Sequence, residues 1–224
     1  LLMHHGPFQT IALDSANIAT FAKLLSMIVD FKSLFTAAHS VGVAQCSMLL
    51  AEIVGMSESE VKLMEIAGLL HDLGKLVVPN SILEKPAGLT HAEMAVMKQH
   101  TYHTFSILST IGGLQMIAEW GAYHHERLDG KGYPFRREAH EMNLGARIMA
   151  VSDIFTALAE DRPYRSGMEA ERIKTILQEQ ADCGFQDLRI IKLLFENMEE
   201  VRTAVKERQE QARYSYQVEL EKSE

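Results

Sequence analysis

The stretch Leu69-Leu70-His71-Asp72-Leu73-Gly74-Lys75 places a histidine and an aspartate side by side at the end of an apolar, helical run. Glycine is common where helices stop, so Gly74 predicts that the helix ends near this pair. The imidazole of His71 and the carboxylate of Asp72 are both good metal ligands, and the two oxygens of Asp72 could bridge two ions. Lys75 adds a positive charge, suited to a phosphate oxygen, about one helical turn away. Because His-Asp pairs are common at protein surfaces, a metal site is predicted only if the rest of the chain supplies matching ligands.

The composition predicts a globular protein that handles any phosphorylated ligand through local charge. The chain has 224 residues, of which 47% are hydrophobic, enough for one large domain or two small ones. Its formal net charge of −8 argues against a nucleic-acid polymer as a partner, since such surfaces are basic. Positive charge for a phosphorylated substrate must therefore come from metals or from a few Arg and Lys side chains.

The cysteines, and the absence of a predicted membrane span or signal peptide from the sequence, indicate the cellular context. Cys46 and Cys183 do not form a disulfide framework, so we expect a reducing cytoplasm in which both are small buried residues. No apolar run is long enough to predict a membrane span. The first residues have neither a starting Met nor the pattern of a signal peptide. We therefore expect a piece of a longer protein with an upstream sensor region.

Helical periodicity recurs along the chain, whereas strand-like alternation does not, which predicts an all-α fold. Capping boxes at Ser57 and Thr90, each followed three residues later by Glu60 or Glu93, predict two of the helix starts. Glycines and prolines over residues 127–143 predict a loop. The expected helices cover residues 15–30, 32–54, 57–71, 90–110, 114–125, 144–160 and 168–181, with a short turn around Ile82.

A last helix is expected to begin near Asp187 and to run beyond residue 210. Its first half carries apolar residues three or four apart, which favours packing on its own domain. These residues are Leu188, Ile191, Phe195, Met198, Val201 and Val205. Beyond Val205 the sequence is polar all round, so we expect this half to project from the domain or to form a homodimer with a second copy.

Further candidate ligands lie on other helices. His39 shares an apolar helix face with Val43 and Cys46, although by itself it is better explained as a hydrogen-bonded core histidine. His100 and His103 are one turn apart, and either could be the ligand while the other lies at the surface.

Two other features strengthen the prediction of a metal site. The pair His124-His125 ends a helix immediately before the glycine-rich loop. Asp153 lies among Ile, Val and Phe, where an acid is costly unless it is exposed, paired or bound to metal. Mixed imidazole and carboxylate ligands without a thiolate suit iron or manganese better than a structural zinc site.

Together these residues resemble the HD-GYP family, a subgroup of the HD-domain metal phosphohydrolases, from about Phe31 to Phe195. The resemblance implies an all-α HD-domain helical bundle with a glycine-rich GYP loop and a long C-terminal helix. It also implies hydrolysis of cyclic dinucleotides, chiefly cyclic di-GMP. The matching motifs are His39-Ser40, His71–Lys75, Val78–Asn80, Ile82–Pro86, Leu89-Thr90, Met97–His100, His124–Pro134, Ala146–Ile148, Val151–Asp153 and Asp161–Arg165.

The resemblance assigns a role to each candidate residue. One metal would be held by His39, His71, Asp72 and Asp153, and the second by Asp72, His100, His124 and His125. Lys75, Tyr133, Arg162 and Arg165 would contact the dinucleotide. Two cations roughly 3.5–4 Å apart can activate water and steady both the attacking and the leaving oxygen. Asp72, as the bridge, and Lys75, which stabilises growing negative charge, are therefore the expected catalytic residues.

Departures from the family pattern refine the expected metal content. Some members place a Glu four residues before the first histidine to serve a third metal, but Phe35 stands there in this chain. We therefore expect about two divalent ions, Fe or Mn, with Mg, Ni and Zn as alternatives. Thr156 stands where an aspartate is frequent, and Phe185–Asp187 only loosely resembles a Phe-Asp-Pro element. Neither change removes a predicted ligand.

The expected organisation is a helix or linker over residues 1–30, an HD-GYP catalytic domain over 31–200 and a polar helical extension over 201–224. The expected reaction converts cyclic di-GMP to linear pGpG, with GMP as a further product and cyclic GMP-AMP as an alternative substrate. Another HD-type phosphohydrolase, acting on nucleotides or guanosine polyphosphates, is disfavoured by the Gly132–Pro134 loop and the second-metal histidines. A non-catalytic sensor module is disfavoured because a module that only binds has no need of a second metal.

Overall fold

The computed structural model describes residues 15–32, 38–161 and 166–221, and the regular elements in these ranges are helices. The one extended pairing in the described part is an isolated bridge between Asp129 and Glu138, at the base of the loop predicted over 127–143. The expectation of an all-α fold is therefore confirmed.

The helices follow the predicted order with few exceptions. The α-helices are α1 Ser15–Lys32, α2 His39–Ile53, α3 Glu58–Leu70, α4 Asn80–Leu83, α5 His91–Ser109, α6 Gln115–Ala122, α7 Leu144–Ala159, α8 Ala170–Asp182, α9 Leu188–Glu196 and α10 Met198–Glu221. Short 3-10 helices are η1 Leu73–Val77, η2 Tyr123–His125 and η3 Ala139–Glu141. Both predicted capping boxes are present, with the hydroxyls of Ser57 and Thr90 each accepting from the backbone N–H three residues on.

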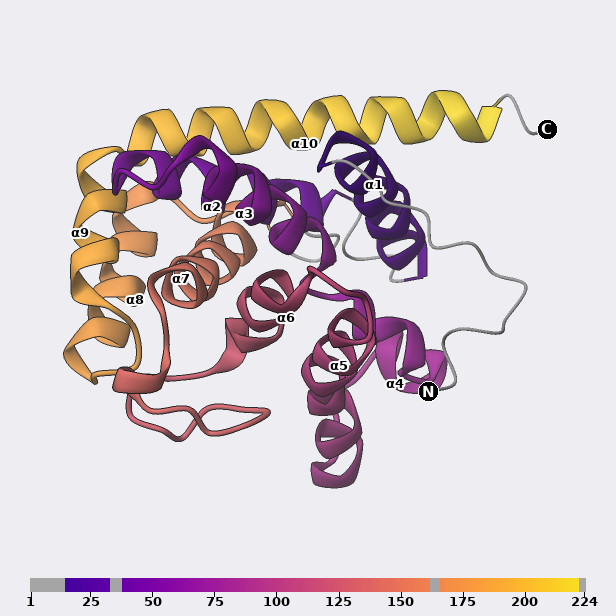
Figure 1. Ribbon diagram of the computed structural model, residues 1–224, viewed down its shortest axis with the longest axis horizontal. Coiled ribbons are helices and arrows are strands. Elements are labelled where there is room, and N and C mark those ends of the chain that lie inside the picture. Colours follow the sequence, from indigo (N-terminus) through magenta and orange to yellow (C-terminus); the bar gives the residue numbers. More distant parts are fainter. Residues whose placement is uncertain (1–14, 33–37, 162–165, 222–224) are drawn as a thin grey trace.

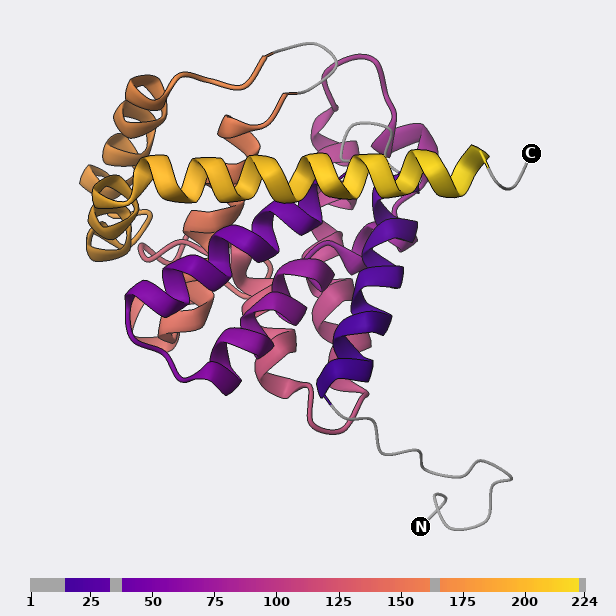
Figure 2. The same ribbon diagram turned by 90° about the horizontal axis from the view of Figure 1, so that it is seen from above.

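The helices surround a core built mainly from α2, α3 and α7. Fully buried side chains of these helices include Leu50, Met64, Ile148 and Phe155. In Figure 1, α10 runs along the top of the molecule over α2, with α8 and α9 at one end and α4 and α5 below at the other. Figure 2, seen from above, shows α10 crossing α2 and passing the end of α1. The C-terminal helix is thus part of the packed bundle.

Two predicted helices differ from the structure in where they begin or end, namely those predicted over residues 32–54 and from Asp187 onward. The helix predicted over residues 32–54 is wrong at its start, because α1 continues to Lys32 and Ala38 has a left-handed backbone with φ 74°, which ends helical geometry. The buried carboxylate of Asp30 explains this conformation, since it accepts hydrogen bonds from the Ala38 N–H (3.2 Å) and the Ser40 hydroxyl (2.9 Å). The last helix is also divided, with α9 ending at Glu196 and α10 beginning at Met198.

The polar half of the last helix packs further along the domain than its sequence indicated. Val201, Val205, Gln209 and Ala212 are buried, four, four and three residues apart, on the face toward α2. The sequence expectation also fails for Cys183, which is exposed, whereas Cys46 is buried; both are free thiols. Among the described helices, none combines the length and the apolar character that crossing a bilayer requires.

Candidate metal centre

The predicted ligands come from five separate segments and meet in the interior. His39 begins α2, His71 and Asp72 follow α3, His100 lies on α5, and Asp153 lies on α7. The η2 turn adds the adjacent histidines His124 and His125. Their possible ligand atoms form three overlapping groups, each within 4.8 Å: His39, His71 and Asp153; His71, Asp72 and His124; His100, His124 and His125. His103 belongs to none of these groups, so the geometry favours His100 as the ligand of that pair.

Close packing of η1 against α5 brings Asp72 next to His100. Gly74 makes this approach possible, because a Cβ there would overlap the carbonyl oxygen of His100. The N–H of Gly74 donates to the hydroxyl of Thr104 (2.9 Å), and that hydroxyl donates to the carbonyl oxygen of His71 (2.9 Å). The glycine predicted to end the helix therefore also determines how closely Asp72 approaches His100.

Three histidines share one local hydrogen-bond pattern. The Nδ1 atoms of His71, His100 and His124 each lie close to a carbonyl oxygen three residues earlier, at 2.7, 2.7 and 2.6 Å. A carbonyl only accepts, so Nδ1 carries the proton and Nε2 of the neutral ring carries a lone pair. This is the orientation that metal-binding histidines use when the second ring nitrogen is held by a backbone carbonyl.

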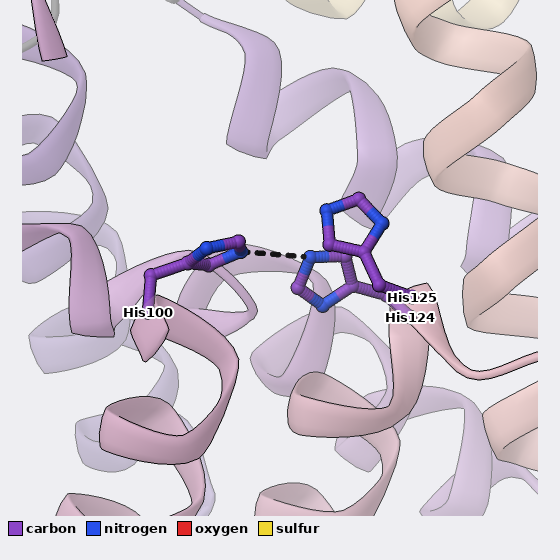
Figure 3. A group of neighbouring side chains, drawn as sticks. All are labelled: His100, His124 and His125. Atoms are coloured by element: carbon purple, nitrogen blue, oxygen red, sulfur yellow. Dashed lines mark hydrogen bonds between the residues drawn. The ribbon is translucent and has the colours of Figure 1, made fainter. Parts of the chain in front are cut away.

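The lone pairs converge on one another. Nε2 of His100 lies 3.3 Å from Nε2 of His124, and Figure 3 shows these rings facing each other beside His125. Burial lowers the pKa of His100 to about 4 and that of His124 well below its usual value, so both rings are neutral at pH 7. Nε2 of His71 is buried and has no hydrogen-bond partner among the described residues. The neutral nitrogens of His100 and His124 fit a cation between them. Burial alone would lower the pKa of His71, but Asp72 outweighs it and raises this pKa, so Nε2 of His71 can join them once the ring has lost its proton.

The carboxylate of Asp72 lies between His71 on one side and His100 and His124 on the other. Its Oδ2 is 3.2 Å from Nε2 of His71, while its Oδ1 is 3.3 Å from Nε2 of His100 and 4.0 Å from Nε2 of His124. Burial alone would raise the pKa of this carboxyl, but Lys75, whose ammonium is 2.5 Å from Oδ2, and His71 hold the pKa of Asp72 well below its usual range. Asp72 is therefore an ionised carboxylate with one oxygen toward His71 and the other toward His100 and His124.

His39 differs from the other histidines because two carboxylates hold its ring. Nε2 is 3.1 Å from Oδ1 of Asp153, and Nδ1 is 3.0 Å from Oε2 of Glu160. Burial alone would lower the pKa of His39, but Glu160 and Asp153 outweigh it and raise the pKa to about 10. Sequence reasoning missed Glu160. The signal was present, because Glu160 ends the same apolar helix in which Asp153 was singled out.

The loop after His125 is fixed to the metal centre by a residue whose role the sequence did not reveal. The buried carboxylate of Glu126 accepts from the N–H groups of Phe135 (2.6 Å) and Arg137 (3.0 Å), which closes the loop on itself. Gly132 packs against this segment, where a Cβ would collide with the backbone of Glu126. The N–H of Tyr133 donates a 3.2 Å hydrogen bond to the carbonyl oxygen of His125, which holds Tyr133 next to the histidine pair.

Tyr133 consequently lies at the edge of the metal centre. Its ring centroid is 4.8 Å from that of His125, whose side chain is 33% exposed, so the two mark the solvent side. The ammonium of Lys98, a residue to which no role was assigned, lies 5.0 Å from the Tyr133 centroid. Arg162 and Arg165, predicted to bind substrate, and Phe35, the departure from a third-metal ligand, lie outside the described residues.

The profile of the HD-domain family matches residues 23–187 of this chain. The chain belongs to the HD-domain family. This matched range contains every residue that the geometry brings into the metal centre.

Within this family, the chain is similar in sequence to proteins named as cyclic dinucleotide phosphodiesterases. The chain is 34% identical over 194 residues to 3′3′-cGAMP-specific phosphodiesterase 1 of Vibrio cholerae serotype O1, covering 87% of this chain and 45% of that protein. It is 40% identical over 146 residues to a cyclic di-GMP phosphodiesterase of Thermotoga maritima, covering 64% of this chain and 40% of that protein. The chain thus spans less than half the length of either relative.

A solved structure shows the same likeness in three dimensions. The crystal structure of a cyclic GMP-AMP specific phosphodiesterase of Vibrio cholerae superposes with a TM-score of 0.55 at 31% identity. The superposition covers 84% of this chain and 42% of that one. The resemblance stated from the sequence motifs is therefore confirmed at the level of the family.

Proposed function

We propose that this chain is a divalent-metal-dependent phosphodiesterase domain that hydrolyses cyclic dinucleotides. The observation that carries the proposal is the position of Asp72, with one carboxylate oxygen toward His71 and the other toward His100 and His124. This arrangement suits a bridging carboxylate between two ion sites. The names of the relatives support the same class of substrate.

The proposed ion sites follow the geometric groups. His39, His71 and Asp153 would hold one ion, and His100, His124 and His125 the other. Asp72, which groups with His71 and His124, would be shared by both ions. Two bound divalent ions of this kind supply an activated water and neutralise charge on the phosphodiester. We propose iron or manganese, because the donors are nitrogen and oxygen without thiolate.

The protein's own residues would orient the substrate and stabilise its charge. Lys75 is partly buried, with 18% of its side chain exposed, and its ammonium contacts Asp72, so the charge is directed to the metal centre. A fixed cation there would stabilise the negative charge that grows on the phosphodiester. The exposed edge formed by His125 and Tyr133 leaves an aromatic face on which a guanine could stack. Lys98 adds a cation beside that face.

The assignment of Arg162 and Arg165 to the substrate stays a proposal, resting on the motif that contains them. A homodimer through the C-terminal helix likewise stays a proposal. Because α10 uses its buried face within the chain, a dimer would have to use the opposite face. An upstream sensor region and a cytoplasmic location are also proposed.

Incubation of Mn²⁺-loaded protein with cyclic di-GMP and, separately, with cyclic GMP-AMP tests the function. Separation of the products by chromatography should show linear dinucleotide from at least one of them, and Asp72→Ala should show none. Guanosine tetraphosphate in a parallel incubation tests the alternative HD-type activity. Metal-loaded, folded protein that leaves both cyclic dinucleotides intact would contradict the proposal.

Comparing the two cyclic dinucleotides also addresses specificity. The relatives include enzymes named for each of them, so the names support the class and leave the choice open. We propose cyclic di-GMP as the preferred substrate, with pGpG as the first product. A higher kcat/KM for cyclic GMP-AMP would reverse this preference without affecting the proposed class.

A further inference from the structure

His39 depends on a distant part of the chain for its orientation. His71, His100 and His124 are each oriented by a carbonyl of their own local segment, three residues earlier. His39 is the first residue of α2 and directly follows the left-handed Ala38. Its Nδ1 instead donates to Glu160, at the C-terminal end of α7.

Glu160 is in turn held by the C-terminal helix. Its carboxylate oxygen Oε2, which accepts from His39, also accepts from the side-chain amide of Gln209 on α10 (3.2 Å). The same amide donates to the carbonyl oxygen of Ala38 (3.4 Å), immediately before His39. Glu160 and Gln209 are 6% and 4% exposed, so water does not compete strongly for these bonds.

The backbone of α2 is shaped to admit Gln209. Gly42 lies one turn after Ala38, and a Cβ there would come within 2.5 Å of Nε2 and 2.9 Å of Cδ of Gln209. Cγ2 of Thr156, one turn before Glu160 on α7, would be 2.9 Å from the same Cβ. Glycine at this position therefore allows the amide to pass between α2 and α7 and reach Glu160.

We propose that Glu160 is a positioning residue for His39 and that Gln209 of α10 holds it in place. Docking of the C-terminal helix thereby sets the metal affinity of the site that contains His39. The proposal rests on the metal centre of the proposed function. A carboxylate that accepts from Nδ1–H fixes the ring tautomer with the Nε2 lone pair toward the ion, and it makes that nitrogen a stronger donor.

Binding of Mn²⁺ alone, without nucleotide, tests the proposal. Calorimetric titration of metal-free protein should resolve two sites in the wild type. Glu160→Ala should weaken one of them by about 10–100-fold, the usual effect of losing a partner that orients a metal ligand. Glu160→Gln keeps an acceptor for Nδ1–H and should recover part of the affinity. Gln209→Leu, similar in size, should weaken the same site by about tenfold.

Matched variants on exposed positions separate this effect from general damage. Glu207→Gln and Gln211→Leu make the same chemical changes at exposed residues of α10 and should leave both Mn²⁺ affinities unchanged. Thermal unfolding of each metal-free variant shows whether it is folded. If Glu160→Ala does not fold, Glu160→Gln and Gln209→Leu decide the question.

The Mn²⁺ affinities of the Glu160 and Gln209 variants decide whether these residues position His39. Weakening confined to one ion site in Glu160→Ala or Gln209→Leu supports the proposal. Unchanged affinity in folded Glu160→Ala, or in both milder variants, overturns it. Equal weakening of both sites also overturns it, because it indicates a general structural effect. A wild type that binds no Mn²⁺ would instead contradict the metal centre and the proposed function.

Discussion

Oδ1 of Asp72 lies 3.3 Å from Nε2 of His100, a histidine on a different helix, although Asp72 is adjacent in sequence to another candidate ligand, His71. Because its other oxygen faces His71, removing this carboxylate affects both ion sites. Asp72→Ala should lose activity and metal affinity by on the order of 100-fold or more, beyond the loss of a partner that only orients a ligand. Elemental analysis after gel filtration, with circular dichroism for folding, measures this. Retained metal and activity would show that Asp72 is no bridge.

The choice between His100 and His103 gives a matched pair on one helix. His100 is 2% exposed and belongs to a ligand group, whereas His103 is half-buried and belongs to none. His100→Ala should lower Mn²⁺ affinity at one site by on the order of 100-fold, and His103→Ala by less than about threefold. Parallel titrations of the two variants compare them. The reverse order would mean that the assignment on α5 is wrong.

The two ion sites should respond differently to pH. Since the carboxylates of Glu160 and Asp153 raise the pKa of His39 to about 10, this ring is protonated at pH 7 in the metal-free protein and must lose a proton to bind metal. Burial lowers the pKa of His100 to about 4, so His100 binds without losing a proton. Between about pH 6 and 8, affinity should rise at least tenfold per pH unit at the first site, since Asp72 outweighs burial and also raises the pKa of His71, and it should stay constant at the second.

Calorimetric titration in buffers of different ionisation enthalpy measures the protons released at each site. Glu160→Gln is the informative variant, because it removes one of the charges that keep His39 protonated and should shallow the pH dependence of the first site. Identical slopes at both sites would contradict the assignment of His39 to one of them.

Glu126 should act on the loop and not on the metals. Its carboxylate accepts from two loop N–H groups, and leaving a buried donor without a partner costs about 1–3 kcal/mol of stability. Glu126→Ala should therefore lower the unfolding temperature and raise KM, because the Tyr133 segment is less fixed, while the metal content stays normal. Lys131→Ala, at an exposed position of the same loop, is the control. A loss of metal from Glu126→Ala would indicate that Glu126 supports the histidine pair instead.

Arg162 and Arg165 are predicted to bind phosphate. Arg162→Ala and Arg165→Ala should each weaken binding of a slowly hydrolysed dinucleotide analogue by about 1.5–3 kcal/mol, or tenfold and upward, with normal metal content. Calorimetric titration of the analogue into metal-loaded protein measures this change. Unchanged affinity in both variants would assign the arginines to structural roles and leave the charge of the substrate to Lys75 and the metals.

The sequence predicted the helices and the ligand types because both depend on local patterns. Capping boxes and apolar periodicity act within one helix, and they located α3 and α5 closely. The start of α2 was not predictable in this way. Its left-handed Ala38 is stabilised by Asp30 of α1, a contact between residues that belong to different helices.

Gln209 was missed for the same reason. Gln209 lies in the polar run from Lys206 to Gln211, which reads as a solvated helix face. Its burial follows from the crossing of α10 over α2 at Gly42, and its bond to Ala38 spans 171 residues of sequence. Sequence patterns identify which residues can bind metal, whereas the residues that orient them depend on tertiary packing.

Anomalous diffraction at the manganese edge, from crystals of the Mn²⁺-loaded protein, would locate the bound ions relative to Asp72. Two peaks are expected, on opposite sides of the Asp72 carboxylate. One would be ligated by His39, His71 and Asp153, and the other by His100, His124 and His125. A single peak, or two peaks without Asp72 between them, would contradict the bridged metal centre.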